Sequence, residues 1–330
     1  MAIVEGIGTI AIESPDGELR AMFAPDAGMV CCSLRHLGEE LLAQRAGLRA
    51  YAERGSTMGI PLLHPWANRL AGFTYGAAPR LVELARDCPL IKLDENGLPI
   101  HGVIAGYLPC QVLESRPEDA GHSVRAQMRW DTPELLATFP FPHVLELEAR
   151  ITAARLTIET TLRPSSTDAV PVSFGYHPYL VLPGSDRREW QVTLPVGRSL
   201  SVDSQMIPTG TSEPVSYPPF KLGDTSWDNP FGGLPSRPVF AVAGAGRRIE
   251  LELLRGYPYA QVFSPAAESF ICFEPMTAPT NALISHADLK LVAPGEVFRA
   301  AFSISVSTGR RTPERVESER LSDCRPGDVR

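Results

Sequence analysis

Four short segments of the 330-residue chain gather polar side chains among glycine, proline and aromatic residues. They are 65–72, with Asn68 and Arg69; 97–102, with His101; 173–179, with His177; and 273–282, with Glu274. Each falls where strand-like periodicity stops, and loops at such places carry binding and catalytic residues on a rigid scaffold. Aromatic rings pack on the C–H faces of sugars, while charged groups and histidines hydrogen-bond their hydroxyls. The segments therefore predict a sugar pocket.

Several common catalytic motifs are absent or out of context. The patterns G-x-x-x-x-G-K-[ST], H-E-x-x-H and G-x-S-x-G do not occur, which disfavours P-loop phosphoryl transfer, zincin proteolysis and α/β-hydrolase chemistry. Residues 6–11 match G-x-G-x-x-A, but this segment reads as a strand that enters a turn at 14–17. A dinucleotide site needs a strand before the glycines and a helix after them, so none is expected here.

Strand-like alternation recurs along the chain. Residues 143–151 and 156–163 alternate apolar and polar side chains around a short turn, which predicts a β-hairpin. The pattern returns at 249–253 and is clearest at 298–307. Alternation implies one wet face, so we expect antiparallel sheets and an all-β fold.

Helical signals are few, and one large domain is expected. Residues 38–54 are compatible with one or two helices, and 132–134 open a short helix. Because all-β domains can exceed 200 residues without splitting, we expect a single domain over residues 1–308. Residues 309–330 lose all periodicity and are rich in charge, which predicts a flexible C-terminal tail.

Composition excludes several classes of partner. The chain carries 31 Lys and Arg and 38 Asp and Glu, a net charge of −7, so nucleic acid is not an expected partner. No apolar run approaches the ~18 to 20 residues that span a bilayer, and the N-terminus lacks the pattern of a secretory signal, so no membrane partner is expected. The six cysteines lack C-x-x-C spacing, which argues against disulfides and a zinc site. We expect a soluble, cytoplasmic protein.

Taken together, the four polar segments resemble the aldose 1-epimerase (mutarotase) family. The N-R-x-x-G, H-G, F-G-x-H-P-Y and E-P-x-T-x-x-x-N-A segments occur in the family's order and at similar spacing, and the resemblance covers roughly residues 5 to 307. It implies a large antiparallel β-sandwich of the galactose mutarotase-like type with few short helices and an open sugar cleft. A small sugar is the implied partner, and a monomer or homodimer is expected.

The resemblance also implies roles for individual residues. Glu274 matches the family's catalytic base and His177 its general acid. Arg69 matches the arginine that holds sugar hydroxyls, with Asn68 beside it, and His101 matches the second conserved histidine. The remaining histidines have no motif support and are expected to be structural: His36, His64, His122, His143 and His286.

The sugar-binding aspartate has two candidates. Residues 222–233 resemble the family's L-G-D-T-x-x-D-x-x-F-x-G variant, which points to Asp228, three residues before Phe231. Asp224, three residues before Trp227, is the alternative.

The chemistry of anomer exchange agrees with this assignment. Removing the proton of the C1 hydroxyl while protonating the ring oxygen opens the pyranose, and rotation and reclosure give the other anomer. A carboxylate can accept the first proton, and an imidazole, with an unperturbed pKa near ~6.5, can donate the second. No redox change and no leaving group are involved, so the sequence predicts neither a metal ion nor a cofactor.

Other functions remain as alternatives to an isomerase acting on a free aldose. A hexose-6-phosphate 1-epimerase needs basic residues at the cleft rim, for which the sequence offers Arg54 and Arg80. A non-catalytic sugar-binding protein needs neither Glu274 nor His177. A glycoside hydrolase needs two carboxylates, which leaves His177 unexplained. Because the net charge is −7, we expect free aldoses to have higher kcat/KM than their 6-phosphates.

Overall fold

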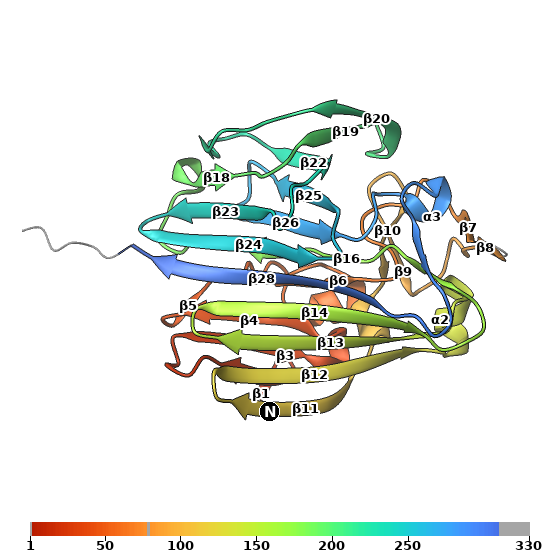
Figure 1. Cartoon of the computed structure of the whole chain (residues 1–330), viewed down its shortest axis with the longest axis horizontal. Helices are drawn as coiled ribbons and strands as arrows, with labels where there is room; N and C mark the ends of the chain where they lie inside the picture. The colour runs from red at the N-terminus through yellow and green to blue at the C-terminus, as the bar shows by residue number, and fades with distance from the viewer. Residues whose placement is uncertain (1, 78–79, 310–330) are drawn as a thin grey trace, which may run out of the picture.

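The computed structural model describes residues 2–77 and 80–309, and the tail predicted at 309–330 lies outside this range except for Gly309. One layer is an antiparallel sheet of nine strands (Figure 1). Its strand order is β11 (Gln111–Glu118), β12 (Gly121–Trp130), β13 (His143–Thr152), β14 (Arg155–Pro164), β28 (Phe298–Thr308), β24 (Arg247–Arg255), β23 (Val239–Gly244), β18 (Gln191–Thr193) and β21 (Phe220–Lys221).

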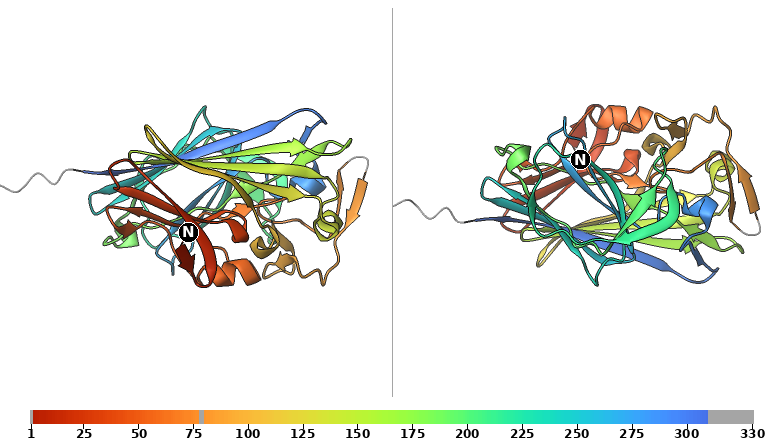
Figure 2. Two further views of the ribbon diagram at one scale, coloured as in Figure 1. Left: turned by 90° about the horizontal axis from the view of Figure 1, so that it is seen from below. Right: turned by 90° about the horizontal axis from the view of Figure 1, so that it is seen from above.

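Two further sheets form the opposite layer. Figure 2, which turns the molecule by 90°, shows this layer apart from the nine-stranded sheet. The eight-stranded sheet contains β20 (Pro208–Pro214), β19 (Arg198–Val202), β22 (Trp227–Gly232), β25 (Tyr259–Ser264), β26 (Ile271–Met276), β16 (Gly175–Tyr176) and β6 (Leu62–Leu63), with β17 (Tyr179–Leu180) also paired to β26. The five-stranded sheet contains β1 (Ala2–Val4), β2 (Ile7–Glu13), β3 (Leu19–Ala24), β4 (Val30–His36) and β5 (Glu39–Glu40).

Short elements complete the described chain. The paired strands are β7 (Thr74–Ala77) with β8 (Arg80–Glu83), β9 (Ile91–Leu93) with β10 (Pro99–Val103), and β15 (Val170–Val172) with β27 (Lys290–Val292). The helices are α1 (Leu48–Arg54), α2 (Pro133–Thr138), α3 (Ala282–Ser285) and the 3₁₀ turns η1 (Pro25–Ala27), η2 (Ala105–Tyr107) and η3 (Arg187–Glu189). None of the described helices is long and apolar enough to cross a membrane.

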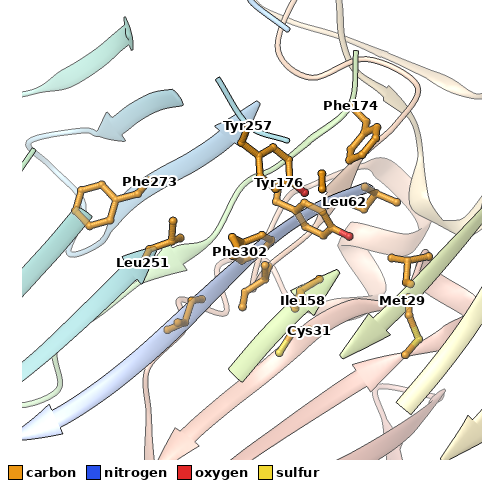
Figure 3. Packing of buried hydrophobic residues seen from close by; sticks show 14 of the residues in the cluster. Met29, Cys31, Leu62, Ile158, Phe174, Tyr176, Leu251, Tyr257, Phe273 and Phe302 are labelled. Atoms are coloured by element: carbon orange, nitrogen blue, oxygen red, sulfur yellow. The ribbon is translucent and has the colours of Figure 1, made fainter. Parts of the chain in front are cut away.

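A continuous apolar core joins the two layers. Ile158 of β14 and Phe302 of β28 belong to the same buried cluster as Tyr176 of β16 and Phe273 of β26 (Figure 3). The rings of Tyr176 and Phe302 lie 5.1 Å apart, and the Tyr176 hydroxyl is 2.7 Å from Oγ1 of Thr160, so the polar tip of the tyrosine is satisfied inside the core. Burial of each such large side chain stabilises the fold by about 1.5–3 kcal/mol, which holds the site-bearing sheet rigidly on its partner.

The sequence-based strand predictions are confirmed. The predicted hairpin is β13 and β14, paired in register from His143–Pro164 to Thr152–Arg155. The segments at 249–253 and 298–307 are the adjacent strands β24 and β28. Residues 7–13 form β2 and then turn, so the glycine pattern at 6–11 opens no helix.

The prediction for residues 38–54 is wrong in its first half. Only Leu48–Arg54 forms a helix, whereas Glu39–Glu40 is a strand. The carboxylate of Glu40 accepts hydrogen bonds from the backbone N–H groups of Leu34, at 2.9 Å, and Leu42, at 3.2 Å. These bonds hold the segment as a strand beside β4. A local helical pattern in the sequence cannot reveal this pairing. The short helix expected at 132–134 is confirmed as α2, capped by the Thr132 hydroxyl.

Candidate active site

Strand β26 carries Glu274 on the face of the eight-stranded sheet that points away from the core. Ile271 and Phe273 belong to the main core cluster, and side chains alternate along a strand, so Cys272, Glu274 and Met276 point the other way. The Glu274 side chain is only 2% exposed. A carboxylate is therefore held in an almost water-free position, which is costly unless it serves chemistry or finds partners.

Strands β25 and β22 add polar side chains on the same face. Gln261 is the direct cross-strand partner of Glu274, and Asp228 is that of Phe263. Cross-strand partners share a face, so both side chains are brought to the Glu274 side. The amide of Gln261 donates to the Asp228 carboxylate at 2.5 Å.

His177 approaches Glu274 from the opposite side, between β16 and β17. Its ring stacks on that of Tyr179, with centroids 4.3 Å apart and planes 9° apart. Its Nε2 lies 3.2 Å from Oε1 of Glu274 and 3.4 Å from the Tyr179 hydroxyl. An imidazole and a carboxylate thus lie within 3.2 Å of each other, and both are groups that can transfer protons.

Strand β10, which lies beside the loop after β6, places His101 next to His177. His101 presents its ring edge-on to His177, with centroids 5.5 Å apart. Its φ is +64° and that of Gly102 is +71°. A Cβ on Gly102 would lie 2.1 Å from the backbone oxygen of His64, so the close approach of the two chains requires glycine. The His-Gly dipeptide of the motif is explained by this approach.

Arg69 is held rigidly in the same loop. Its Nε donates to Asp94 at 2.7 Å, its Nη1 to Asn68 Oδ1 at 3.1 Å and its Nη2 to Glu95 at 3.4 Å. The Asp94 carboxylate in turn accepts from the backbone N–H groups of Asn96 and Leu98, both at 2.9 Å. Arg69 is therefore oriented before any ligand arrives.

The asparagine of the fourth motif, Asn281, connects the segment after β26 to the loop that carries Arg69. The side-chain oxygen of Asn281 accepts a hydrogen bond from the N–H of Ala71 at 2.9 Å. The Asn281 N–H donates to the backbone oxygen of Arg69 at 3.0 Å. The segment after β26 thus holds the Arg69 loop beside Glu274 and His177.

These side chains line one cleft of about 310 Å³, a size suited to a monosaccharide. Its lining residues are Arg45, Thr57, Asn68, Arg69, Lys92, Glu95, Ile100, His101, His177, Tyr179, Asp228, Gln261, Phe263 and Glu274. All six site residues expected from the sequence are among them. Asp224 lies outside, exposed in the turn before β22.

Sequence reasoning missed several lining residues. Tyr179 closes the third motif and was not singled out, although its position two residues after His177 was a usable signal. Arg45 and Lys92 lie outside every motif and reach the cleft only through the fold. A hollow of about 440 Å³ around 234–238 and 253–258 is more voluminous, but it contains no acid–base pair comparable to Glu274 and His177.

Burial dominates the electrostatics of the cleft. Burial and, next, the nearby Asp228 raise the pKa of Glu274 well above its usual value, while Arg69 opposes the shift. Burial also lowers the pKa of His177 well below its usual value, with His101 adding to the effect.

The structure is thus an all-β sandwich with a buried carboxylate and imidazole in one polar cleft. The chain belongs to the aldose 1-epimerase family, whose sequence model matches residues 21–305.

Individual relatives are distant. The chain is 25% identical over 259 residues to the uncharacterized protein YihR of Escherichia coli K12, which covers 74% of this chain and 80% of that protein. Its fold is similar to that of a galactose mutarotase-like protein from Clostridium acetobutylicum, with a TM-score of 0.81 at 18% identity, covering 93% of this chain and 97% of the other. It is also similar to the galactose 1-epimerase from Lactobacillus acidophilus, with a TM-score of 0.73 at 12% identity and coverages of 94% and 97%.

Proposed function

We propose that the protein is an isomerase that interconverts the α and β anomers of an aldose, with Glu274 as the base and His177 as the acid. The observation that carries this proposal is the 3.2 Å contact between two nearly fully buried groups, Glu274 Oε1 and His177 Nε2, on the floor of a sugar-sized cleft. Family membership supports it, because the matched region contains both residues.

The reaction uses one proton at each end of the hemiacetal. Glu274 takes the proton of the C1 hydroxyl as His177 gives a proton to the ring oxygen, and the C1–O5 bond breaks. The ring-opened sugar is then a neutral aldehyde, with Glu274 protonated and His177 neutral. Rotation about C1–C2 followed by the reverse transfers closes the ring on the other face, so protons and charges balance over the cycle.

Burial of the pair assists ring opening. Before opening the pair is carboxylate and imidazolium, and after opening it is carboxylic acid and imidazole. Desolvation disfavours charged forms, so it raises the pKa of Glu274 and lowers that of His177. Both shifts favour the neutral pair, which is the state that accompanies the open-chain sugar, over the charged pair that precedes ring opening.

Four further residues are proposed to hold the sugar hydroxyls. They are Asn68, Arg69 and His101, which lie on the loop after β6 and on β10, and Asp228, which lies on β22 on the other side of Glu274. Asp228 is preferred to Asp224 because it lines the cleft.

The rate at which the two anomers interconvert can be measured directly. We expect the protein to accelerate α to β exchange of at least one aldose in an NMR magnetisation-exchange experiment across free hexoses, pentoses and their 6-phosphates. A non-catalytic sugar-binding protein would instead perturb the sugar resonances without raising the exchange rate, and that result would overturn the proposal.

A further inference from the structure

Two cations line the cleft and take no part in the proposed chemistry. Arg45, in the turn after β5, donates through Nη1 to the backbone oxygen of Thr57 at 3.1 Å and to the Tyr179 hydroxyl at 3.0 Å. Lys92, on β9, donates to the backbone oxygen of Gly55 at 3.1 Å. Within residues 2–77 and 80–309, neither cation forms an ion pair with a carboxylate, in contrast to Arg69. Their remaining N–H donors are available to a ligand in the cleft.

The order of strands places Arg45 beyond His177 as seen from Glu274. Strand β26, which carries Glu274, is followed by β17, and the segment before Arg45 pairs with β17 through the bridge between Leu42 and Leu180. The Ala43 N–H donates to the backbone oxygen of Tyr179 at 2.9 Å, which fixes this alignment. A sugar whose anomeric hydroxyl meets the base and whose ring oxygen meets the acid then extends its C5 side toward Arg45.

The two cations also lie close enough to affect each other. Burial lowers the pKa of Lys92 and Arg45 lowers it further, while the nearby Glu95 opposes the shift. Arg45 and Lys92 likewise contribute, after burial and His101, to the low pKa of His177. Like charges gathered in a partly buried cleft destabilise the empty protein, and an anion placed between them relieves the repulsion.

We infer that the substrate is an aldose carrying an anionic group, a carboxylate or a phosphate, on its C5 side, bound by Arg45 and Lys92. The inference rests on the proposed function and names its substrate class. It reverses the preference expected from the net charge of −7, because charges spread over the surface are screened beyond about 8 Å at physiological ionic strength whereas these two face the ligand.

The basic residues that the sequence offered for this role lie elsewhere. Arg54 is exposed at the end of α1 and approaches Glu53 at 3.8 Å. Arg80 pairs with Asp168 at 2.5 Å. Neither lines the cleft, so Arg54 provides a control with the same change of charge.

The test compares matched neutral and anionic sugars. Exchange between anomers is measured by NMR for glucose, glucuronate and glucose 6-phosphate, and for the galactose series, with the wild-type protein and the variants Arg45→Gln, Lys92→Gln and Arg54→Gln. We expect kcat/KM for one anionic sugar to exceed that of its neutral partner about 10- to 100-fold at low salt, since hydrogen bonds to charged groups have this strength. The ratio should fall at high salt, drop about tenfold in each cleft variant and stay unchanged in Arg54→Gln.

The outcomes separate the inference from the proposed function. Absence of exchange with every sugar, neutral or anionic, would overturn the function itself. Exchange with neutral sugars at a ratio of one or below, or a ratio insensitive to salt and to both cleft variants, would overturn the inference and leave the function standing. Loss of the contact with Tyr179 can unfold the Arg45→Gln variant, and thermal melting reveals whether it does. In that case the Lys92→Gln variant alone tests the inference. Preference for glucuronate over the phosphate, or the reverse, identifies the anion.

Discussion

Replacement of Glu274 by glutamine keeps the volume of the side chain but removes the proposed base. General base catalysis typically contributes about 10²- to 10⁴-fold. The Glu274 side chain is 2% exposed and lies 3.2 Å from His177, so no bulk water can take its place next to the C1 hydroxyl. We therefore expect the rate of anomer exchange to fall toward the 10⁴-fold end of that range.

The assay starts from a pure α-anomer and follows the approach to equilibrium by optical rotation, with the spontaneous rate subtracted. Sugar binding, measured by NMR line broadening, should persist in Glu274→Gln because Arg69, Asn68 and Asp228 remain. Glu250→Gln is the matched control, since Glu250 pairs with Arg248 on the nine-stranded sheet, away from the cleft. A Glu274→Gln protein with exchange within a few-fold of wild type would refute the assignment of the base.

Three further outcomes are expected. Arg69→Ala should raise KM more than it lowers kcat, because a pre-oriented clamp on hydroxyls binds ground and transition states alike; a pure kcat defect would place its charge on the developing transition state. Treatment with a chelator should leave activity intact, and loss restored by a divalent metal would contradict the proposed chemistry. Burial raises the folded-state pKa of Glu274, so its stabilising contribution is present below pH 4.5 and is lost as the pH rises through the folded value. Glu274→Gln should accordingly raise Tm more at pH 8 than at pH 4, and an equal shift at both would contradict a buried, ionising carboxylate.

Local pattern was sufficient to predict the scaffold. Alternation at 143–151, 156–163 and 298–307 marks strands because one face of each is buried against the opposite layer, and that burial dictates residue type directly. The motifs contain all six residues that were expected in the cleft. Two of their other residues also have a structural cause: Gly102 is required by a close approach of two chain segments, and the Asn281 side chain binds the backbone of the Arg69 loop.

Long-range contacts were beyond the reach of such patterns. Arg45 reaches the cleft through Tyr179, which is 134 residues away, and its segment carries a spacing compatible with a helix. Asp94, which orients Arg69, lies in a turn between two short strands and has no motif of its own. Charge gathered by the fold from separate segments is invisible to a net count over the chain, so the value of −7 does not describe the charge inside the cleft.

The cleft is built at a cost in backbone energy that its surroundings must offset. Asn68, His101 and Asn281 all adopt left-handed φ values, of +56°, +64° and +69°. Such residues cost of order 1–3 kcal/mol each and persist only where neighbouring contacts over-determine them. Here the His101 N–H donates to the Asn68 backbone oxygen at 2.9 Å and the Asn281 N–H to the Arg69 backbone oxygen at 3.0 Å, so the three strained positions support one another. Strain, a buried carboxylate and two cations that form no ion pair within residues 2–77 and 80–309 therefore meet at one cleft, and the proposed binding of a sugar by a fixed set of charges accounts for all three.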